Sequence, residues 1–280
     1  MKERPATRST DFGSVALRPR MVEKPWGRTD LPAEFGSTGD RQIGEIWYEH
    51  PSGDYLPLLA KYIFTSEKLS IQVHPDDAHA RHHGLSHGKS ECWYVLDADE
   101  GAVLGLGLTQ NLTSAEIRGA ALDGSIEELL AWQPVSAGDF IFVPAGTIHA
   151  IGAGITLLEF QQNTDVTYRL YDYGRPRELH LDDATEVARS GFDCGASFCH
   201  PDAAEPVLID RNEFSLVRAR TLNDLPQSLV SRRRWVMPLE GTASAGGVTV
   251  SPGDCMLASA GDPISLSSPA VVLVGVEGAL

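Results

Sequence analysis

The segment Gly138–His149 constrains the fold of this chain more than any other, because it combines a turn, a short strand, a second turn and a histidine. Phe140–Val143 is an apolar run between Gly138-Asp139 and Pro144-Ala145-Gly146. Short apolar runs bounded by Gly and Pro are typical of β-strands. Similar runs fill the first two thirds of the sequence. We therefore predict a mainly β protein with a histidine close behind one of its turns.

Two other segments can bring metal-binding side chains towards His149. Gln72 and His74 fall on one face of a short strand, because successive strand side chains point to opposite faces. Glu91 opens a second apolar run, and Lys89 lies on the same face. One amide oxygen, two imidazoles and one carboxylate form a set that suits zinc or another divalent first-row ion. The sequence therefore predicts a metal site at Gln72, His74, Glu91 and His149.

These residues carry a resemblance to a known family. The spacing from Gly138 through Pro144 and Gly146 to His149 resembles the second signature of the cupin superfamily. The pairs Gln72-x-His74 and Lys89-x-Glu91 are similar to those of type I phosphomannose isomerases. The resemblance spans roughly Lys24–Asp183 and includes Lys24-Pro25-Trp26-Gly27, Pro57–Lys61, and Glu159 ten residues before Arg169.

The resemblance implies both a fold and an activity. The fold would be a cupin (jelly-roll) β-barrel with a small helical insert, followed by a second, degenerate C-terminal β-barrel. The activity would be an aldose-ketose isomerisation that interconverts mannose 6-phosphate and fructose 6-phosphate through a cis-enediol. One zinc ion per chain would serve as the Lewis acid, held by Gln72, His74, Glu91 and His149.

The resemblance also implies roles for residues outside the metal set. Glu159 is the candidate general base, with a water bound to the metal as the alternative, and it lies on the inward face of its strand. Arg169 interrupts an apolar strand, so we expect it to pair either with an anionic substrate or with Glu159. The residues expected to act in catalysis are Glu159, Arg169 and Lys89, and those expected to bind the sugar phosphate are Lys61, Ser70, Lys89, Arg169 and Trp26.

We predict two domains. Residues 1–200 would form the metal-bearing catalytic domain, with its helical insert at about 113–132. Thr113-x-x-Glu116 and Ser125-x-x-Glu128 fit the capping-box pattern at the start of a helix. A further helix or turn is expected at Asp182–Ser190, and Cys194–Pro206 fits a linker. Residues 201–280 would form the degenerate domain.

The tail repeats the first half in weakened form. Trp235–Gly241 follows the pattern of the strand at Trp93, and Gly253–Gly261 follows Gly138–Gly146. In this alignment Ile264 takes the place of His149 and Arg233 that of Glu91, with Ser259 at the place of Pro144. We therefore expect the tail to bind no metal.

Several histidines stand apart from this pattern. His79, His82, His83 and His87 lie in the polar stretch Asp76–Gly88 without regular spacing. We expect this stretch to be a solvated loop rather than a second metal site.

Charge and cysteine content limit the partners and the compartment. The net charge of −15 at pH 7 argues against nucleic acid and anionic membranes as partners. No apolar run is long enough to cross a bilayer, and the polar stretch Met1–Arg20 lacks the apolar core of a secretory signal. Four cysteines do not form a disulfide-scaffold pattern, so we expect a cytoplasmic protein, either a monomer or a homodimer, that acts on a small sugar phosphate.

Two alternative functions remain open. One is an iron-dependent cupin dioxygenase, which Gln72 disfavours because an amide oxygen is a weaker donor to redox iron than a histidine. The other is a metal-binding cupin that senses or binds a sugar phosphate without turnover. Retention of Lys89, Glu159 and Arg169 beside the ligands disfavours that alternative.

Overall fold

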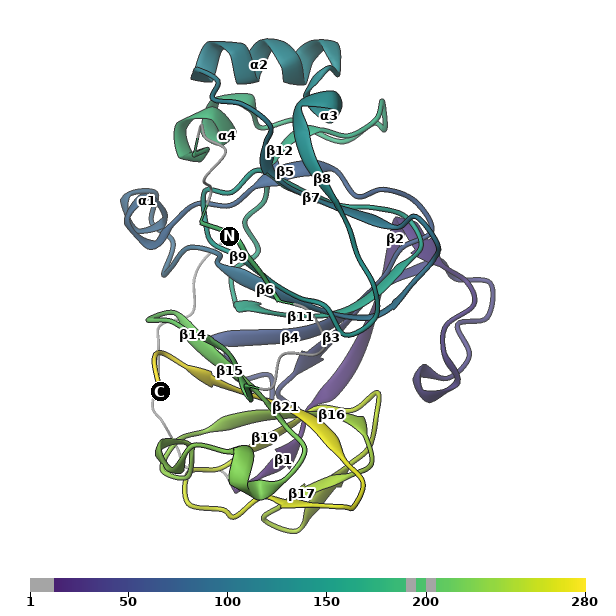
Figure 1. The fold of residues 1–280 in the computed structure, drawn as a ribbon, viewed down its shortest axis with the longest axis vertical. Coiled ribbons are helices and arrows are strands. Elements are labelled where there is room, and N and C mark those ends of the chain that lie inside the picture. The colour runs from purple at the N-terminus through teal and green to yellow at the C-terminus, as the bar shows by residue number, and fades with distance from the viewer. Residues whose placement is uncertain (1–12, 190–194, 200–204) are drawn as a thin grey trace. The chain divides into compact units, whose positions relative to one another are not determined.

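The computed structural model describes residues 13–189, 195–199 and 205–280 and is mainly β (Figure 1). The chain divides into two compact units. The larger unit comprises Arg18–Ile209, and the smaller comprises Asp210–Leu280 together with the stretch that ends at Leu17. The smaller unit therefore includes β1 (Val15–Ala16), which pairs with β19 (Met256–Ala258).

The larger unit contains two antiparallel sheets. The seven-stranded sheet has the order β13-β9-β6-β11-β4-β3-β2, and the five-stranded sheet has the order β12-β5-β10-β7-β8. The strands of the first are β2 (Arg18–Arg28), β3 (Ile43–Glu49), β4 (Leu58–Phe64), β6 (Glu91–Ala98), β9 (Phe140–Val143), β11 (Ile155–Gln162) and β13 (Ser197–Cys199). Those of the second are β5 (Ile71–Val73), β7 (Val103–Leu108), β8 (Leu130–Pro134), β10 (His149–Ile151) and β12 (Tyr168–Tyr171).

The two sheets face each other across an apolar core. Trp93 and Leu157 from the seven-stranded sheet pack with Leu104 and Ile151 from the five-stranded sheet, and all four are buried. Burial of such side chains between two sheets is the main stabilising contribution in a β-sandwich or barrel. The predicted jelly-roll cupin fold is confirmed.

Helices cover the outer face of the five-stranded sheet, where Ile117 and Ile126 pack against Ile71 and Leu170 (Figure 1). The predicted insert consists of α2 (Ser114–Asp123) and α3 (Ile126–Leu129). The helix or turn expected at Asp182–Ser190 is α4 (Leu181–Val187). No helix in the described part of the chain is long and apolar enough to cross a membrane. The remaining helices are α1 (Asp77–His82) and the 3-10 turns η1 (Ala33–Phe35), η2 (Leu222–Asp224) and η3 (Gln227–Leu229).

The capping predictions had different outcomes. Thr113 and Glu116 form the predicted capping box of α2. The box predicted at Ser125 is wrong, because Ser125 has helical backbone angles and its side chain caps nothing. Gly124 ends α2 in the left-handed conformation, and α3 follows after a single residue. A capping serine needs an extended backbone, and Ser125, the single residue between Gly124 and α3, does not adopt one.

Two predicted loops contain regular structure. The expected loop at Asp76–Gly88 holds α1, whose first turn is capped because the Asp76 carboxylate accepts a hydrogen bond from the backbone N–H of His79. The expected linker Cys194–Pro206 holds β13, which pairs with β9. The rest of that linker, including Cys194, lies largely outside the described residues.

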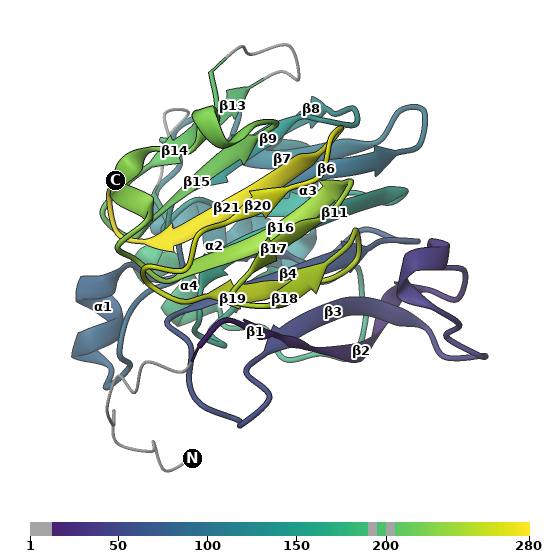
Figure 2. The ribbon, with the colours of Figure 1, turned by 90° about the horizontal axis from the view of Figure 1, so that it is seen from below.

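The smaller unit contains a three-stranded sheet of order β18-β17-β20 and five strands of a six-stranded sheet of order β1-β19-β16-β21-β15-β14, in which the boundary between the units falls within β14. Figure 2 shows β15, β21 and β16 side by side in the six-stranded sheet. The strands not yet named are β14 (Val207–Asp210), β15 (Phe214–Ala219), β16 (Arg234–Glu240), β17 (Ala243–Ala245), β18 (Val248–Val250), β20 (Ser265–Leu266) and β21 (Val271–Glu277).

The strand orders of the two units repeat. The run β9-β6-β11-β4 in the larger unit corresponds to β19-β16-β21-β15 in the smaller, in the same chain order. The run β8-β7-β10 likewise corresponds to β18-β17-β20. The second, degenerate barrel expected from the sequence is therefore present.

The pairing corrects the repeat alignment by one residue. Glu91 lies opposite Val143 in the larger unit, and Arg234 lies opposite Ala258 in the smaller. Since Ala258 aligns with Val143, Arg234 rather than Arg233 takes the place of Glu91. Arg234 is buried and donates to two backbone carbonyls, whereas Arg233 is exposed.

Candidate active site and metal centre

Strand pairing brings the four predicted metal ligands together. Gln72 in β5 lies directly opposite His149 at the start of β10, and His74 follows β5 by one residue. Glu91 is the first residue of β6. His74 Nε2 lies 3.4 Å from Glu91 Oε2, and His149 Nε2 lies 3.3 Å from Glu91 Oε1. The two imidazoles, whose ring centroids are 4.9 Å apart, thus each contact a different oxygen of one carboxylate.

Backbone carbonyls orient both imidazoles. His74 Nδ1 lies 2.9 Å from the carbonyl oxygen of Val166, and His149 Nδ1 lies 2.9 Å from that of Thr147. A carbonyl only accepts, so each Nδ1 carries the proton and each Nε2 presents a lone pair towards Glu91. Burial lowers the pKa of both imidazoles, with the nearby Lys89 ammonium adding to the effect and bringing that of His74 to about 3. Both rings are therefore neutral near pH 7.

Glu91 completes an anionic, cation-binding group. Burial opposes its ionisation, but the charge of the Lys89 ammonium favours it, and the pKa of Glu91 lies well below its usual range. Lys89 Nζ lies 2.9 Å from both Glu91 Oε2 and His74 Nε2. Glu91 Oε2 is within ion-pair distance of this ammonium yet accepts no well-aligned hydrogen bond. Two lone pairs and a carboxylate with spare acceptor capacity fit a divalent ion, so His74, Glu91 and His149 could hold a metal.

Gln72 lies beside this group, and its amide nitrogen faces the ligand atom of His149. Its Nε2 lies 3.3 Å from His149 Nε2, while its Oε1 accepts a hydrogen bond from Ser70 Oγ at 3.2 Å. Exchange of the amide oxygen and nitrogen by rotation would present the oxygen to the metal group. Gln72 can therefore act as a fourth, oxygen ligand only after this rotation.

A carboxylate and an ammonium lie beside this group, on the strands of the seven-stranded sheet that follow β6. Glu159 in β11 lies directly opposite Lys61 in β4 and Trp93 in β6. Lys61 Nζ lies 3.0 Å from Glu159 Oε1, and the Trp93 indole donates to Glu159 Oε2 at 3.2 Å. Burial, followed by the charge of Glu91, raises the pKa of Glu159 to about 7 despite the opposing effect of Lys61. Such a carboxyl exchanges protons readily near neutral pH.

Arg169 does not pair with Glu159, which was one of the two partners expected for it. It lies opposite Gln72 in the β5–β12 pairing and is half-buried. Its Nη1 donates to the carbonyl oxygen of Glu178 at 2.9 Å, and its Nε has no hydrogen-bond partner. Within the described part of the chain, no carboxylate lies within ion-pair distance of this guanidinium, so it retains capacity for an anion.

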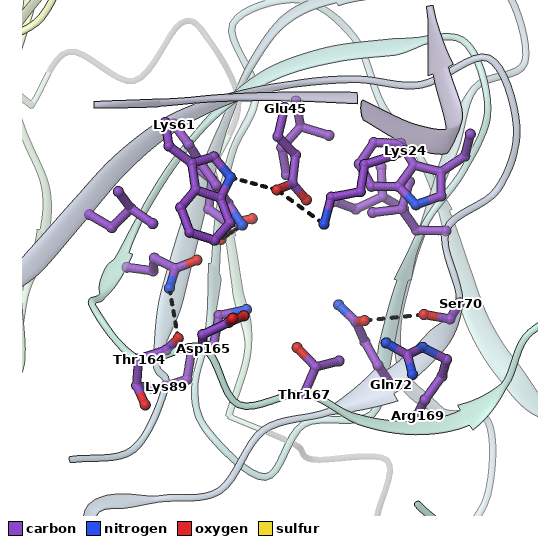
Figure 3. A pocket seen from close by; sticks show the side chains of 18 of the residues that line it. Lys24, Glu45, Lys61, Ser70, Gln72, Lys89, Thr164, Asp165, Thr167 and Arg169 are labelled. Atoms are coloured by element: carbon purple, nitrogen blue, oxygen red, sulfur yellow. Dashed lines mark hydrogen bonds and ion pairs between the residues drawn. The ribbon is translucent and has the colours of Figure 1, made fainter. Parts of the chain in front are cut away.

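All the residues proposed for catalysis and substrate binding line one pocket (Figure 3). Lys24, Glu45 and Lys61 face Ser70 and Arg169 across it. His74, Glu91 and His149 lie behind the lining, where Gln72 and Lys89 connect them to the pocket. The predicted residues found in the lining are Trp26, Lys61, Ser70, Gln72, Lys89, Glu159 and Arg169.

The lining also includes charged and aromatic residues that were not predicted from the sequence, among them Lys24, Glu45, Trp47 and Arg177. Glu45 and Trp47 lie two residues apart in β3 and so share one face of the strand. The Trp47 indole donates a hydrogen bond to Glu45 Oε2 at 2.6 Å. Lys24 Nζ lies 3.4 Å from the same carboxylate oxygen, and Arg177 adds a further cation. A buried glutamate in an apolar strand was available as a signal, because it is the same pattern that identified Glu159.

The chain is similar in sequence to mannose-6-phosphate isomerases over 61–65% of its length. No family model matches it. It is 37% identical over 220 residues to a mannose-6-phosphate isomerase of Streptococcus mutans, which covers 65% of this chain and 69% of that protein. It is 43% identical over 212 residues to the isomerase ManA of Bacillus subtilis, which covers 61% of this chain and 66% of that protein.

Solved structures agree. The crystal structure of the Bacillus subtilis mannose 6-phosphate isomerase has a TM-score of 0.75 and 27% identity, and the match covers 94% of this chain and 99% of that one. A putative mannosephosphate isomerase of Archaeoglobus fulgidus shares the fold, with a TM-score of 0.72 and 15% identity over 95% of this chain and 97% of that one. The chain belongs to the mannose-6-phosphate isomerase family.

Proposed function

We propose that this chain is a zinc-dependent isomerase that interconverts mannose 6-phosphate and fructose 6-phosphate. The observation that carries the proposal is a single pocket whose lining includes a carboxyl of pKa about 7 and whose residues Gln72 and Lys89 contact the metal-binding group behind it. An aldose–ketose isomerisation needs both. It requires a Lewis acid for the oxygen that gains charge and a base that moves a proton between C1 and C2.

His74, Glu91 and His149 would hold the zinc ion, with Gln72 as the fourth ligand. Two imidazoles, one carboxylate and one amide oxygen match the nitrogen and oxygen ligands that zinc takes in proteins. When bound, zinc would supply Lewis-acid polarisation of the sugar oxygens. Lys89, beside these ligands, can donate a hydrogen bond to the same oxygens as they become negative.

Glu159 would act as the general base. In the free enzyme Lys61 and Trp93 hold its carboxylate at the pocket wall. The carboxylate would take the proton from C2 of the aldose to give the cis-enediol and return it to C1. The same carboxyl then serves both directions, which suits a pKa near the working pH.

The pocket cations would bind the phosphate. Lys24, Lys61, Lys89, Arg169 and Arg177 line one pocket in a chain whose net charge is −15. Screening over about 8 Å at physiological ionic strength lets this local cluster outweigh the distant negative charge. We assign Arg169 the main phosphate contact because its guanidinium has spare donors, with Lys61 and Ser70 as further contacts and Trp26 as a wall.

A coupled assay with mannose 6-phosphate on metal-stripped and zinc-restored protein tests the activity. Turnover that vanishes on stripping and returns with zinc is expected, and binding without turnover would favour the sugar-phosphate sensor. Running the reaction in D₂O tests the cis-enediol, because a base exchanges its proton with solvent. Turnover without any deuterium at C1 or C2 would instead point to a direct hydride shift. The cytoplasmic location and the monomeric or homodimeric state stay predictions.

A further inference from the structure

We infer that α1 and α4 carry a second divalent-cation site, formed by His79, His83 and Glu186 and separate from the buried centre. His79 Nδ1 lies 3.6 Å from Glu186 Oε1. The rings of His79 and His83 stack with centroids 4.2 Å apart. One ligand atom from each of the three residues lies within 4.8 Å of the others. His79 and His83 were expected to lie in a solvated loop, and Glu186 in the helix or turn predicted at Asp182–Ser190.

The helical geometry of α1 creates the pair of histidines. Asp76 caps the helix by accepting a hydrogen bond from the His79 backbone N–H. The backbone N–H of His83 bonds to the carbonyl oxygen of His79, which keeps the turn helical up to His83. Residues four apart lie on one helix face, so both imidazoles point the same way. Histidines with this spacing form a common bidentate metal site.

The third ligand comes from α4. Glu186 is the penultimate residue of that helix, and its side chain is 60% exposed, whereas the His79 side chain is only 12% exposed. Figure 1 shows α1 and α4 on the same side of the larger unit. His79 thus forms a fixed side of the site, and Glu186 can turn towards a bound ion. His83 is likewise exposed and can adjust.

His79 also has the outer partner that metal-binding histidines require. Its Nε2 lies 3.5 Å from the Tyr168 hydroxyl, on the far side of the ring from Glu186. A hydrogen bond there would fix the ring and leave Nδ1 for a metal. Tyr168 is itself buried in β12, so the partner is firmly held.

The ligand set selects the ion. Two imidazoles and one carboxylate favour zinc, cobalt or nickel over calcium and magnesium, which prefer oxygen ligands. Three protein ligands leave room for water. Two of the three side chains are exposed and must lose rotamer freedom on binding, so this site is weaker than the buried centre.

An ion bound at this second site would restrict the motion of the segment between His74 and Lys89. α1 lies in the stretch that joins His74 to Lys89. The segment is already tied at Asp77, whose carboxylate accepts hydrogen bonds from Gly88 N at 2.8 Å and from Gln162 Nε2 at 3.0 Å. An ion bound by residues of both α1 and α4 would link this segment to α4 as well. Because the ion binds the folded chain, it also raises the free energy of unfolding.

The experiment uses full-length protein already loaded with one equivalent of zinc. Cobalt is then titrated, followed by visible absorption, calorimetry and the melting temperature. We expect one further ion per chain and a rise in melting temperature. His83→Ala and Glu186→Gln should each weaken this binding by at least about tenfold, the cost of losing even an outer-shell partner. Both residues are exposed, so the cobalt-free melting temperature should hardly change.

His82→Ala is the matched control, since His82 is an exposed histidine of the same helix outside the three-residue group. It should bind cobalt as the wild type does. The proposal is overturned if the loaded wild type takes up no further cobalt, if His83→Ala and Glu186→Gln bind it undiminished, or if His82→Ala loses as much affinity as His83→Ala. None of these outcomes depends on isomerase turnover, so the result is independent of the proposed function.

Discussion

Glu159 Oε1 lies 3.0 Å from Lys61 Nζ, and both side chains are almost fully buried in one pocket wall. Burial acts on the two partners in opposite senses. It raises the pKa of the Glu159 carboxyl, whereas for Lys61 it is outweighed by Glu159 and Glu45, which raise the pKa of the ammonium. Lys61 therefore remains charged while Glu159 titrates near pH 7. The ammonium positions the carboxyl group, and the carboxyl group can still gain and lose a proton.

Glu159→Gln should lower kcat by about 10²- to 10⁴-fold, the usual contribution of a positioned general base. Glutamine keeps the shape and can still accept the Trp93 hydrogen bond, so the fold should persist. Steady-state kinetics and circular dichroism check the two parts. Wild-type kcat in a well-folded Glu159→Gln protein would remove Glu159 from the chemistry.

The pH profile of kcat/KM should fall below about pH 7, because the base acts only when deprotonated and the pKa of Glu159 is about 7. Lys61 lowers that pKa, so Lys61→Met should move the acid limb to higher pH. Profiles measured over pH 5–9 for both proteins check the sign. A limb that moves to lower pH in Lys61→Met would contradict the assignment.

Sequence reasoning predicted the metal group but not this ion pair, for a physical reason. Side-chain alternation places Gln72 and His74 on one face whatever the rest of the fold does. The partner of Glu159 depends instead on which strands pair and in which register. Lys61 is far from Glu159 along the chain, and no local pattern specifies that β4 lies beside β11.

The same limit explains what was missed elsewhere. Glu45 and Trp47 reach the pocket only because β3 pairs with β4, which is again a long-range choice. α1 has six residues, too few for an apolar periodicity to stand out. The failed cap at Ser125 depended on where α2 ended, at Gly124. Strong periodic strands were predictable, and short elements and cross-strand partners were not.

His149→Ala should abolish metal binding at the buried centre and reduce turnover to that of stripped protein. The side chain supplies one Nε2 lone pair to the group, while the barrel core around it is built from separate apolar side chains. Most of the secondary structure should therefore survive. Elemental analysis with circular dichroism checks both, and His82→Ala is the control. Full turnover in a metal-free His149→Ala protein would contradict the metal requirement.

Arg169→Ala should lower kcat/KM for the sugar phosphate by about 10- to 100-fold, as expected for loss of a charged hydrogen bond of about 1.5–3 kcal/mol. Its melting temperature should change little, because Arg169 donates only to one backbone carbonyl. Arg177→Ala is the matched comparison. Arg177 makes two hydrogen bonds to the buried Asp172 carboxylate, so its loss should lower the melting temperature more. The reverse order of melting temperatures would show that Arg169 is structural.

The smaller unit should hold no tightly bound ion. Arg234 takes the place that Glu91 has in the larger unit, and its buried guanidinium repels a cation there. No group of three metal-binding side chains occurs in that unit among the residues that the structure describes. After dialysis against a mild chelator, which clears weak surface sites, elemental analysis should find one zinc per full-length chain. The double variant His74→Ala/His149→Ala should hold none. A tightly held ion that survives in the double variant, and still survives when His83→Ala is added to disable the group at α1 and α4, would contradict the assignment of the smaller unit.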